Sequence, residues 1–147
     1  MRILVVCAGN ICRSPLAEEL LRRALSARGV EAEVTSAGLW AEPGLPASEG
    51  LDAPARLRGV DLSRHRARQL EASYLSDADL VLVMTAAQLD DIAGLAPQGS
   101  ATVTVLLLGE ADIDDPYMGN AATYEACAAE IEAGVEVFAD RVTSGRV

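Results

Sequence analysis

The stretch ILVVCAGNICRSPLAEELLRRAL, residues 3–25, decides the fold. It begins with four apolar residues in a row, which is typical of a short strand buried on both faces of a sheet. Ser14 and Pro15 then mark the start of a helix, because proline suits the first helical turn, where no N–H is needed. Apolar residues recur after them at helical spacing, and Gly29 fits the helix end. The sequence therefore predicts a strand, a tight loop and a helix in direct succession.

Strands and helices alternate along the rest of the chain. Short apolar runs predict three more strands, and apolar residues at helical spacing predict the helices. This alternation predicts an α/β fold with a parallel sheet covered by helices on both faces, in which sites form at the carboxyl ends of strands. Cys7 lies at one such end. The expected strands are 33–36, 80–84 and 102–108, the expected helices are 47–57, 86–92 and one carrying Tyr124 to Val142, and the expected loops are 39–46 and 109–120.

The composition favours one globular domain, residues 1–147, with a substantial apolar core. The formal net charge of −10 repels a phosphate backbone, which argues against nucleic-acid binding. We find no apolar stretch long enough for a membrane span and no signal-peptide layout. The three cysteines, an odd number, do not suit a secreted disulfide framework. A cytoplasmic protein is expected, with export by a route that needs no signal peptide as the alternative.

The chain contains no lysine, and this absence excludes two large enzyme classes. A Walker-type phosphate loop and a pyridoxal enzyme both need a lysine. The permanently charged cations are all arginines, whose planar guanidinium binds oxyanions with two parallel hydrogen bonds. His65 is the only histidine, and the cysteines do not have the paired spacing of zinc ligands. We therefore expect neither a metal nor a cofactor.

The loop between the first predicted strand and helix holds a cysteine and an arginine six residues apart. Such a loop directs backbone N–H groups to one point above a helix N-terminus, and this geometry binds anions. The same field stabilises a thiolate at Cys7, while Arg13 binds two oxygens of a phosphoryl group that the sulfur attacks. Gly9 lets the anion approach the backbone closely. The Asn10 side chain is suited to hold the loop by hydrogen bonds, and the Ser14 hydroxyl is suited to stabilise Cys7 when it leaves phosphorus as a thiolate. The alternative is that Cys7 is a buried structural thiol and that Arg13 is only a cation at the start of the helix. A cation at a helix N-terminus is electrostatically unfavourable unless an anion lies beside it.

With these residues the chain resembles the low-molecular-weight protein tyrosine phosphatases. Their phosphate loop, V-C-x-G-N-I-C-R-S-P, is matched at every fixed letter by residues 6–15, VCAGNICRSP. The resemblance implies a flavodoxin-like three-layer fold, a four-stranded parallel sheet in the order 2-1-3-4, and a phosphatase that forms a phosphocysteine. Further matches are TSAG (35–38), HRARQL (65–70), DLVLVM (79–84) and DDPYMG (114–119). By resemblance the phosphate-binding residues are Ala8, Gly9, Asn10, Ile11, Cys12, Arg13 and Ser14, supported by Asn10, Ser14, Ser36 and His65.

Expulsion of a tyrosyl oxygen needs a general acid, because a phenolate leaves poorly without a proton. By resemblance, the family's D-P-Y motif assigns this role to Asp115, and Pro116 restricts the backbone that aims its carboxyl group. Taken alone, the acidic stretch is more simply a solvated turn, since Asp-Pro is common in turns. Together with the phosphate loop, it favours the catalytic interpretation.

The resemblance also implies a substrate slot with flat apolar walls. Trp40 and Tyr117 lie in the two loops that wall the family's cleft, and Ile11 lies in the phosphate loop itself. Such a slot accepts an aryl phosphate, whereas a serine phosphate is too short to reach Cys7. A core position for Trp40 is the alternative. Related protein-arginine phosphatases have threonine in place of Ile11, so isoleucine favours phosphotyrosine.

Cys12 and His65 each have a functional and a structural interpretation. By resemblance, Cys12 traps an oxidised Cys7 in a reversible disulfide, and simple burial of a structural thiol is an equal alternative. His65 heads an arginine-rich stretch, which we interpret as a solvated face with His65 as a structural hydrogen-bonding residue. A patch for acidic phosphoprotein segments is the alternative there. Cys127 falls on the apolar stripe of the last predicted helix and is expected in the core.

The sequence departs from the family's pattern at two positions. Thr85 stands where aspartate is frequent, and Met118 stands where many members have a second tyrosine.

The alternative functions are a thioredoxin-linked arsenate reductase, a protein-arginine phosphatase and a non-catalytic phosphotyrosine-binding module. The reductase needs two further cysteines close together in the sequence. We expect a monomeric, redox-sensitive hydrolase that acts on tyrosine-phosphorylated proteins, with a cognate tyrosine kinase as candidate partner and with neither nucleic acid nor membrane.

Overall fold

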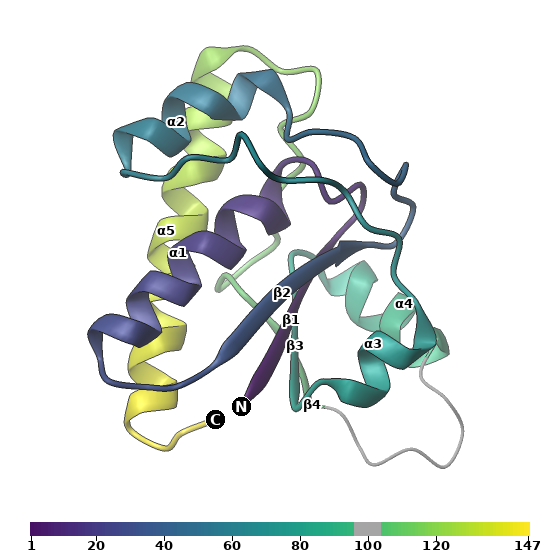
Figure 1. Cartoon of the computed structure of the whole chain (residues 1–147), viewed down its shortest axis with the longest axis vertical. Coiled ribbons are helices and arrows are strands. Elements are labelled where there is room, and N and C mark those ends of the chain that lie inside the picture. The colour runs from purple at the N-terminus through teal and green to yellow at the C-terminus, as the bar shows by residue number, and fades with distance from the viewer. Residues whose placement is uncertain (96–103) are drawn as a thin grey trace.

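The structure, a computed structural model, describes residues 1–95 and 104–147. Its centre is a four-stranded parallel sheet in the order β2-β1-β3-β4, which is the predicted order (Figure 1). β1 pairs with β2 on one side and with β3 on the other, so it lies inside the sheet. The elements are β1 (Arg2–Cys7), α1 (Arg13–Ala27), β2 (Glu33–Gly38), the 3₁₀ turn η1 (Glu49–Leu51), α2 (Asp52–Leu57), α3 (Ala72–Asp77), β3 (Leu80–Val83), α4 (Ala86–Leu95), β4 (Thr104–Leu107) and α5 (Ala121–Thr143).

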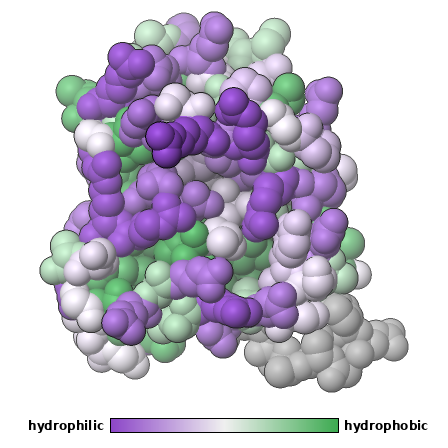
Figure 2. All heavy atoms as spheres, in the orientation of Figure 1, coloured by the Kyte–Doolittle hydropathy of each residue, from purple (hydrophilic) through white to green (hydrophobic). Residues whose placement is uncertain are grey.

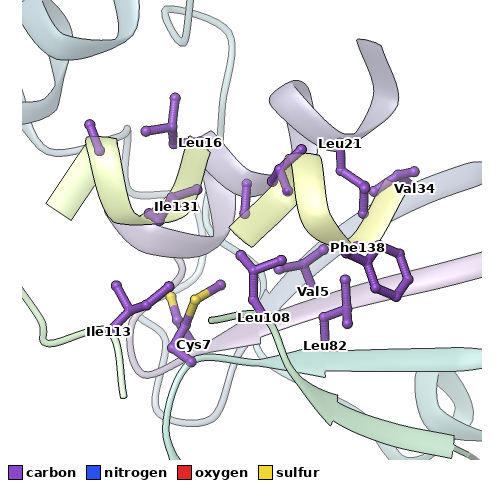
Figure 3. Packing of buried hydrophobic residues seen from close by; sticks show 14 of the residues in the cluster. Val5, Cys7, Leu16, Leu21, Val34, Leu82, Leu108, Ile113, Ile131 and Phe138 are labelled. Carbon is purple, nitrogen blue, oxygen red and sulfur yellow. The ribbon is translucent and has the colours of Figure 1, made fainter. Parts of the chain in front are cut away.

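Both faces of β1 are buried, which explains why its residues are apolar almost throughout. Ile3 and Val5 belong to one apolar cluster with residues of α1 and α5, the helices that cover this face of the sheet (Figures 1 and 3). Leu4 and Val6 belong to a second cluster on the other face, with residues of α3 and α4. Neighbouring side chains of a strand point to opposite faces, so one short run serves both clusters. The predicted three-layer α/β architecture is confirmed.

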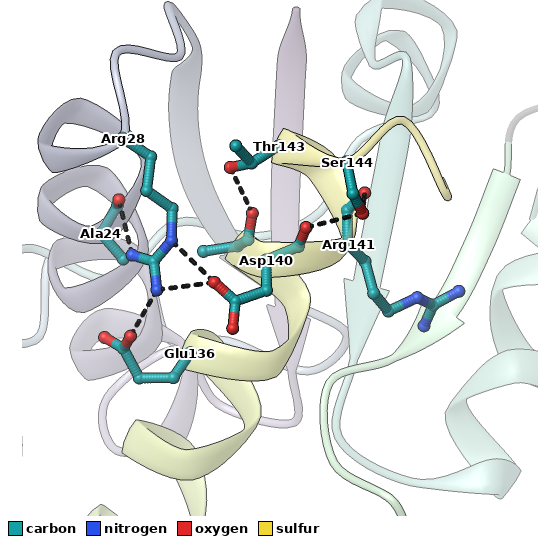
Figure 4. A network of polar contacts seen from close by, with 8 residues as sticks. Ala24, Arg28, Glu136, Asp140, Arg141, Thr143 and Ser144 are labelled. Atoms are coloured by element: carbon teal, nitrogen blue, oxygen red, sulfur yellow. Dashed lines mark hydrogen bonds and ion pairs between the residues drawn. The ribbon is translucent and has the colours of Figure 1, made fainter.

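α1 and α5 are also connected by a polar cluster near their carboxyl ends (Figure 4). Arg28, at the end of α1, donates to Glu136 Oε2 at 2.6 Å and to Asp140 Oδ1 at 3.1 Å. A third bond, 2.9 Å long, goes to the carbonyl of Ala24 within α1 itself. These ion pairs lie at the surface, where each contributes little free energy, so the apolar contact of the two helices dominates their packing. Gly29 follows with φ 72°, the left-handed conformation that ends α1 where the sequence predicted.

The largest departure from the predicted elements lies between residues 47 and 57. The sequence predicts one helix there, but Ser48 is extended, with φ −58° and ψ 134°. Its N–H donates to the carbonyl of Ile11 at 2.8 Å, so contact with the phosphate loop takes the place of a helical turn. Helical structure starts only at Glu49, as η1, and continues as α2. The predicted start of this helix is therefore wrong.

Two smaller differences concern α3 and the last strand. α3 was not predicted, because its six residues bury only Leu75 and show no helical period in the sequence. The last strand was expected over residues 102–108 and spans Thr104–Leu107 among the described residues, while positions 102 and 103 lie outside them. The remaining predicted helices and loops lie within a few residues of their expected bounds.

The face drawn in Figure 2 is largely hydrophilic, with smaller apolar areas between the polar side chains. Among the helices that the structure describes, none combines the length and the apolar character needed to cross a bilayer. Some large apolar side chains are nevertheless exposed, and three of them, Trp40, Tyr117 and Met118, lie on the loops expected to border the site.

Candidate active site

Residues 8–12 of the predicted phosphate loop connect β1 directly to α1, and Arg13 and Ser14 of that prediction open the helix. Cys7 is the last residue of β1 and Arg13 is the first residue of α1, and they are only 2% and 3% exposed. The carboxyl end of a strand in a parallel sheet is where such folds bind ligands, and the unpaired N–H groups at the start of α1 add partial positive charge. The structure therefore places a thiol and a guanidinium at the two ends of one short loop.

Asn10 fixes the loop with all the polar atoms of its side chain. It has φ 56°, a left-handed conformation that asparagine tolerates better than most residues. Its Nδ2 donates to Ser14 Oγ at 2.8 Å and to Ser36 Oγ at 2.9 Å, and its Oδ1 accepts from the Arg68 N–H at 2.9 Å. Asn10 is completely buried, so these bonds compensate for the loss of water. The loop is therefore held from α1, from β2 and from the extended segment before α3.

His65 and Arg68 reach the loop from that extended segment. His65 Nε2 lies 2.6 Å from the carbonyl oxygen of Asn10, and because a carbonyl only accepts, Nε2 is the donor. The Arg68 guanidinium donates from Nε to the carbonyl of Ser36 at 3.0 Å and lies 4.4 Å above the ring of Tyr74. Arg68 is therefore a structural residue, and the interpretation of the whole arginine-rich stretch as a solvated face is wrong at this position.

Gly38 is a site residue that the sequence analysis did not single out, although it ends the quoted TSAG motif. A Cβ atom at this position would lie 2.8 Å from the carbonyl oxygen of Ala8 and 2.9 Å from the amide nitrogen of Asn10. Glycine thus allows the end of β2 to lie directly against the phosphate loop. The next turn continues this contact, since the Trp40 N–H donates to the Ala8 carbonyl at 2.8 Å.

Two polar contacts connect Asn10 through Ser14 to the sulfur of Cys7. The Ser14 hydroxyl accepts from Asn10 Nδ2 at 2.8 Å and lies 2.9 Å from Cys7 Sγ. The Ser14 hydroxyl has a single proton, and a thiolate at position 7 would accept it in a hydrogen bond. Asn10, Ser14 and the positive end of α1 are thus arranged to stabilise negative charge at this sulfur.

The three guanidinium nitrogens of Arg13 have different surroundings. Nη1 is occupied, since it donates to the carbonyl of Ile113 at 2.8 Å. Nη2 lies 3.5 Å from Asp115 Oδ2, and Nε is buried without a hydrogen-bond partner among the residues that the structure describes. The Nε and Nη2 donors form the fork that matches two oxygens of a phosphoryl group. A buried donor left unpaired is unfavourable, so an oxyanion on this edge satisfies a need of the fold.

Asp115 lies on the long loop between β4 and α5, and its side chain is 43% exposed. Its Oδ1 accepts from the N–H of Tyr117 at 3.1 Å, and Pro116 between them is buried. The loop thus holds one carboxylate oxygen and leaves the other near Arg13. The structure brings the predicted general acid to the predicted phosphate-binding arginine.

Of the three predicted slot residues, Ile11 belongs to the phosphate loop, the Trp40 backbone contacts it, and Tyr117 lies two residues after Asp115. Trp40 is 71% exposed and Tyr117 is 56% exposed, so the alternative of a core position for Trp40 is wrong. Ile11 is partly buried and packs against the main apolar cluster. Met118, beside Tyr117, is 85% exposed and has a left-handed φ of 69°. Two exposed aromatic side chains and one isoleucine are thus available to contact an aryl group.

The other two thiols, Cys12 and Cys127, are buried in surroundings that disfavour their ionised forms. Burial, the Asp115 charge and Cys7 raise the pKa of Cys12 to about 11, although hydrogen bonds from Ser48 and Tyr124 lower it in part. Burial raises the pKa of Cys127 to about 12. All three cysteines lie within the described residues and are free thiols. The expected core position of Cys127 is confirmed, because it belongs to the main apolar cluster.

A hydroxyl pair behind the loop was missed in the sequence. Ser48 Oγ lies 2.7 Å from Tyr124 Oη, which connects the segment before η1 to α5. The ring of Tyr124 packs on Gly50, where a Cβ atom would lie 2.3 Å from a ring carbon. No local pattern indicates this pair, because its members come from segments that only the fold brings together.

A thiol and a guanidinium around an anion-binding loop, with a carboxylate beside them on an α/β fold, define a cysteine-dependent phosphatase. The profile of the low molecular weight phosphotyrosine protein phosphatases matches residues 2–146. The chain belongs to this family, and the predicted class of enzyme is confirmed.

Individual relatives agree with the family. A probable low molecular weight protein-tyrosine-phosphatase, EpsP of Ralstonia solanacearum, is 46% identical over 143 residues, which cover 95% of this chain and 94% of that protein. The crystal structure of the tyrosine phosphatase Wzb from Escherichia coli K30 in complex with sulphate has a TM-score of 0.86 at 31% identity, covering 96% of this chain and 97% of that one. The YwlE arginine phosphatase from Geobacillus stearothermophilus has the same TM-score and identity, covering 99% and 94%.

Proposed function

We propose that this chain hydrolyses phosphotyrosine in proteins through a phosphocysteine on Cys7. The observation that carries the proposal is the convergence of Cys7, Arg13 and Asp115 at one loop, in a member of this phosphatase family. Each side chain supplies a different requirement of the reaction: a nucleophile, an anion-binding group and a proton donor.

In the first step, the Cys7 thiolate attacks phosphorus in line with the leaving oxygen. The bond between sulfur and phosphorus forms while the bond from phosphorus to the tyrosyl oxygen breaks. The protonated carboxyl group of Asp115 gives its proton to that oxygen. The Nε and Nη2 donors of Arg13, together with the loop N–H groups, bind the non-bridging oxygens and stabilise their charge in the transition state.

In the second step, water releases the phosphoryl group. The Asp115 carboxylate takes a proton from a water molecule, and the water oxygen attacks phosphorus as the bond to sulfur breaks. The electron pair returns to Cys7 as a thiolate, which the Ser14 hydroxyl stabilises from 2.9 Å. The products are inorganic phosphate and the enzyme with its carboxyl group protonated again.

The depth and walls of the site favour an aryl phosphate. Cys7 is almost completely buried, so a substrate must extend its phosphate into the loop. Trp40 and Tyr117 are exposed aromatic side chains on loops that contact or border the phosphate loop, and Ile11 lies within it. Aromatic pairs contribute about 0.5–1.5 kcal/mol beyond simple burial, which favours tyrosine over a short serine side chain.

Turnover of p-nitrophenyl phosphate tests the proposal. Cys7→Ser should abolish turnover, whereas Cys127→Ala, which changes a thiol outside the site, should retain it. Asp115→Asn should slow hydrolysis of a phosphotyrosine peptide ~10²–10⁴-fold, because it removes the proton donor. Turnover that persists in Cys7→Ser would refute the mechanism.

Phosphoarginine is the alternative substrate that a specific observation favours. The YwlE arginine phosphatase from Geobacillus stearothermophilus has the same fold, with a TM-score of 0.86. Against it stand the exposed aromatic side chains at the site and Ile11 in the loop. We infer that phosphotyrosine is preferred, and a phosphotyrosine peptide and a phosphoarginine peptide of identical flanking sequence compare the two directly.

We infer further that Cys12 protects Cys7 from over-oxidation by forming a disulfide with it. A peroxide first converts the Cys7 thiolate to a sulfenic acid, and the Cys12 sulfur then displaces water from it. Support comes from the placement of both thiols: Cys7 ends β1, Cys12 directly precedes α1, and both are buried. Dimedone should label Cys7 in Cys12→Ser but not in the parent protein, and equal irreversible oxidation of both would contradict the inference.

We also infer the setting in which the enzyme acts. The family profile spans residues 2–146, which supports a single phosphatase domain over residues 1–147. Three free thiols suit a reducing compartment such as the cytoplasm. Tyrosine-phosphorylated proteins and a cognate tyrosine kinase are the inferred partners of a monomeric enzyme. Trapping of phosphoproteins from lysate on Cys7→Ser would identify them.

A further inference from the structure

Asp112, on the loop that carries Asp115, contacts the start of α4. Its Oδ1 accepts a hydrogen bond from the N–H of Ala86 at 2.8 Å. Ala86 is the first residue of α4, and the first N–H groups of a helix have no partner within the helix. A carboxylate at this position is also stabilised by the positive end of the helix dipole. The contact therefore joins two segments that lie far apart in the sequence.

Other donors at the start of α4 are satisfied locally. The Gln88 N–H donates to Thr85 Oγ1 at 3.3 Å, and the Thr85 N–H donates to Gln88 Oε1 at 3.2 Å. This reciprocal pair is a capping box, in which residues three apart satisfy each other's backbone. The N–H of Ala86 lies between them in sequence and binds Asp112 instead. The long-range contact thus adds to the local cap of α4.

Ile113 extends the attachment to the catalytic arginine. Its N–H donates to the carbonyl of Met84 at 2.9 Å, and its carbonyl accepts from Arg13 Nη1 at 2.8 Å. Its side chain is 2% exposed and packs in the main apolar cluster. Asp112 and Ile113 thus fix the loop to the junction of β3 with α4 and to Arg13. Asp115 follows two residues later.

We propose that Asp112 is a positioning residue for the general acid, because its bond to Ala86 sets where the loop holds Asp115 relative to Arg13. The proposal rests on the proposed acid role of Asp115. Asp112 acts through the backbone of the loop rather than on the substrate. Displacing a catalytic group by about 1 Å can cost ~10²-fold in rate, so loss of one attachment is expected to impair proton transfer specifically.

Two substrates separate proton transfer from every other step. Phenyl phosphate needs a proton on its leaving oxygen, whereas 2,4-dinitrophenyl phosphate releases a stable phenolate without one. Asp112→Ala should lower kcat/KM on phenyl phosphate roughly 10-fold or more and leave the dinitrophenyl substrate within about twofold. Asp112→Asn retains an acceptor oxygen and should recover part of the loss. Asp114→Ala removes a neighbouring exposed carboxylate and serves as the matched control, with both rates nearly unchanged.

Asp115→Asn, measured on both substrates, distinguishes the inference from the function on which it rests. If Asp115→Asn loses activity selectively on phenyl phosphate and Asp112→Ala does not, the positioning role is wrong and the acid role stands. If Asp115→Asn shows no selectivity, the acid assignment is wrong and the inference falls with it. An equal loss on both substrates in Asp112→Ala means general damage to the fold and also contradicts the proposal.

Discussion

Arg13 Nη2 lies 3.5 Å from Asp115 Oδ2, although one residue opens α1 and the other lies on the loop before α5. The arginine is buried and the carboxylate is partly exposed, so the pair extends from the floor of the site towards solvent. A separation of 3.5 Å is long for a charge-assisted hydrogen bond. In the proposed mechanism, a phosphoryl group takes the Nε and Nη2 edge of Arg13, and the Asp115 carboxyl group is left beside the leaving oxygen.

Arg13→Lys tests whether the two parallel donors of the guanidinium, Nε and Nη2, are needed. Lysine keeps the positive charge, but it loses the two parallel donors and the bond to the Ile113 carbonyl. We expect kcat/KM for p-nitrophenyl phosphate to fall roughly 10²–10³-fold, the effect of losing a preorganised donor to the transition state. Arg64→Lys, a change of the same kind at an exposed position, is the control. Comparable activity of the two variants would show that charge alone suffices.

Two substitutions of Asn10 separate its hydrogen bonds from its backbone conformation. Asn10→Ala removes bonds to Ser14, Ser36 and Arg68 in a buried site, and should lower the free energy of unfolding by about 3 kcal/mol. Asn10→Gly removes the same bonds but relieves the left-handed φ of 56°, so it should be more stable than the alanine variant by roughly 1 kcal/mol. Urea denaturation measures both values. Equal stability of the variants would mean that φ at this position causes no strain.

Ile11→Thr tests the choice of substrate. Threonine is smaller and more polar, so it should weaken the contact with an aryl ring while leaving Cys7 and Arg13 in place. We expect the ratio of kcat/KM for a phosphotyrosine peptide to that for a phosphoarginine peptide to fall about tenfold, which corresponds to roughly 1.4 kcal/mol. Ile11→Val preserves an apolar side chain and should change the ratio less. An unchanged ratio in both variants would place specificity elsewhere, for example on Trp40 or Tyr117.

The buried thiols predict how stability depends on pH at the alkaline end. Burial raises the pKa of Cys12 from 9.0 to about 11 and that of Cys127 to about 12, so the folded state favours their neutral forms. Their contribution to stability is complete below pH 9, because the thiols are then neutral in the unfolded chain as well. It is lost as the pH rises from about 9 to about 11 for Cys12 and to about 12 for Cys127, because over these ranges the unfolded chain ionises before the folded one. The urea concentration at the midpoint of unfolding should therefore decrease when the pH is raised from 8 to 10.5. It should decrease less in the double variant Cys12→Ser/Cys127→Ala. An equal decrease in both proteins would contradict these pKa values.

The region around β1 could be predicted from sequence because its signals are local. An apolar run, a turn and a proline at a helix start lie within 15 residues of each other, and the structure has β1 and α1 where they indicate. The helix expected from residue 47 failed for the opposite reason. Its start is decided by the bond from the Ser48 N–H to Ile11, a contact between distant segments that no periodicity reports.

The site residues also divide into those that a local sequence pattern indicates and those that only the fold brings together. Cys7 and Arg13 belong to one short motif, and their anion-binding geometry follows from a strand, a loop and a helix N-terminus. Asp115 was placed by resemblance to a family rather than by any local rule. The side chains that hold the loop, such as Arg68 and Gly38, were not identified in these roles, because each acts through a backbone contact that only the folded sheet creates.

Rapid acid quenching of the enzyme with a phosphotyrosine peptide, followed by mass spectrometry, detects the phosphocysteine itself. We expect the peptide containing Cys7 to carry one phosphoryl group within the first turnover, and Cys7→Ala to carry none and to release no phosphate. Phosphate release from the parent enzyme with Cys7 unmodified at every time point, or a phosphoryl group on a different residue, would contradict it.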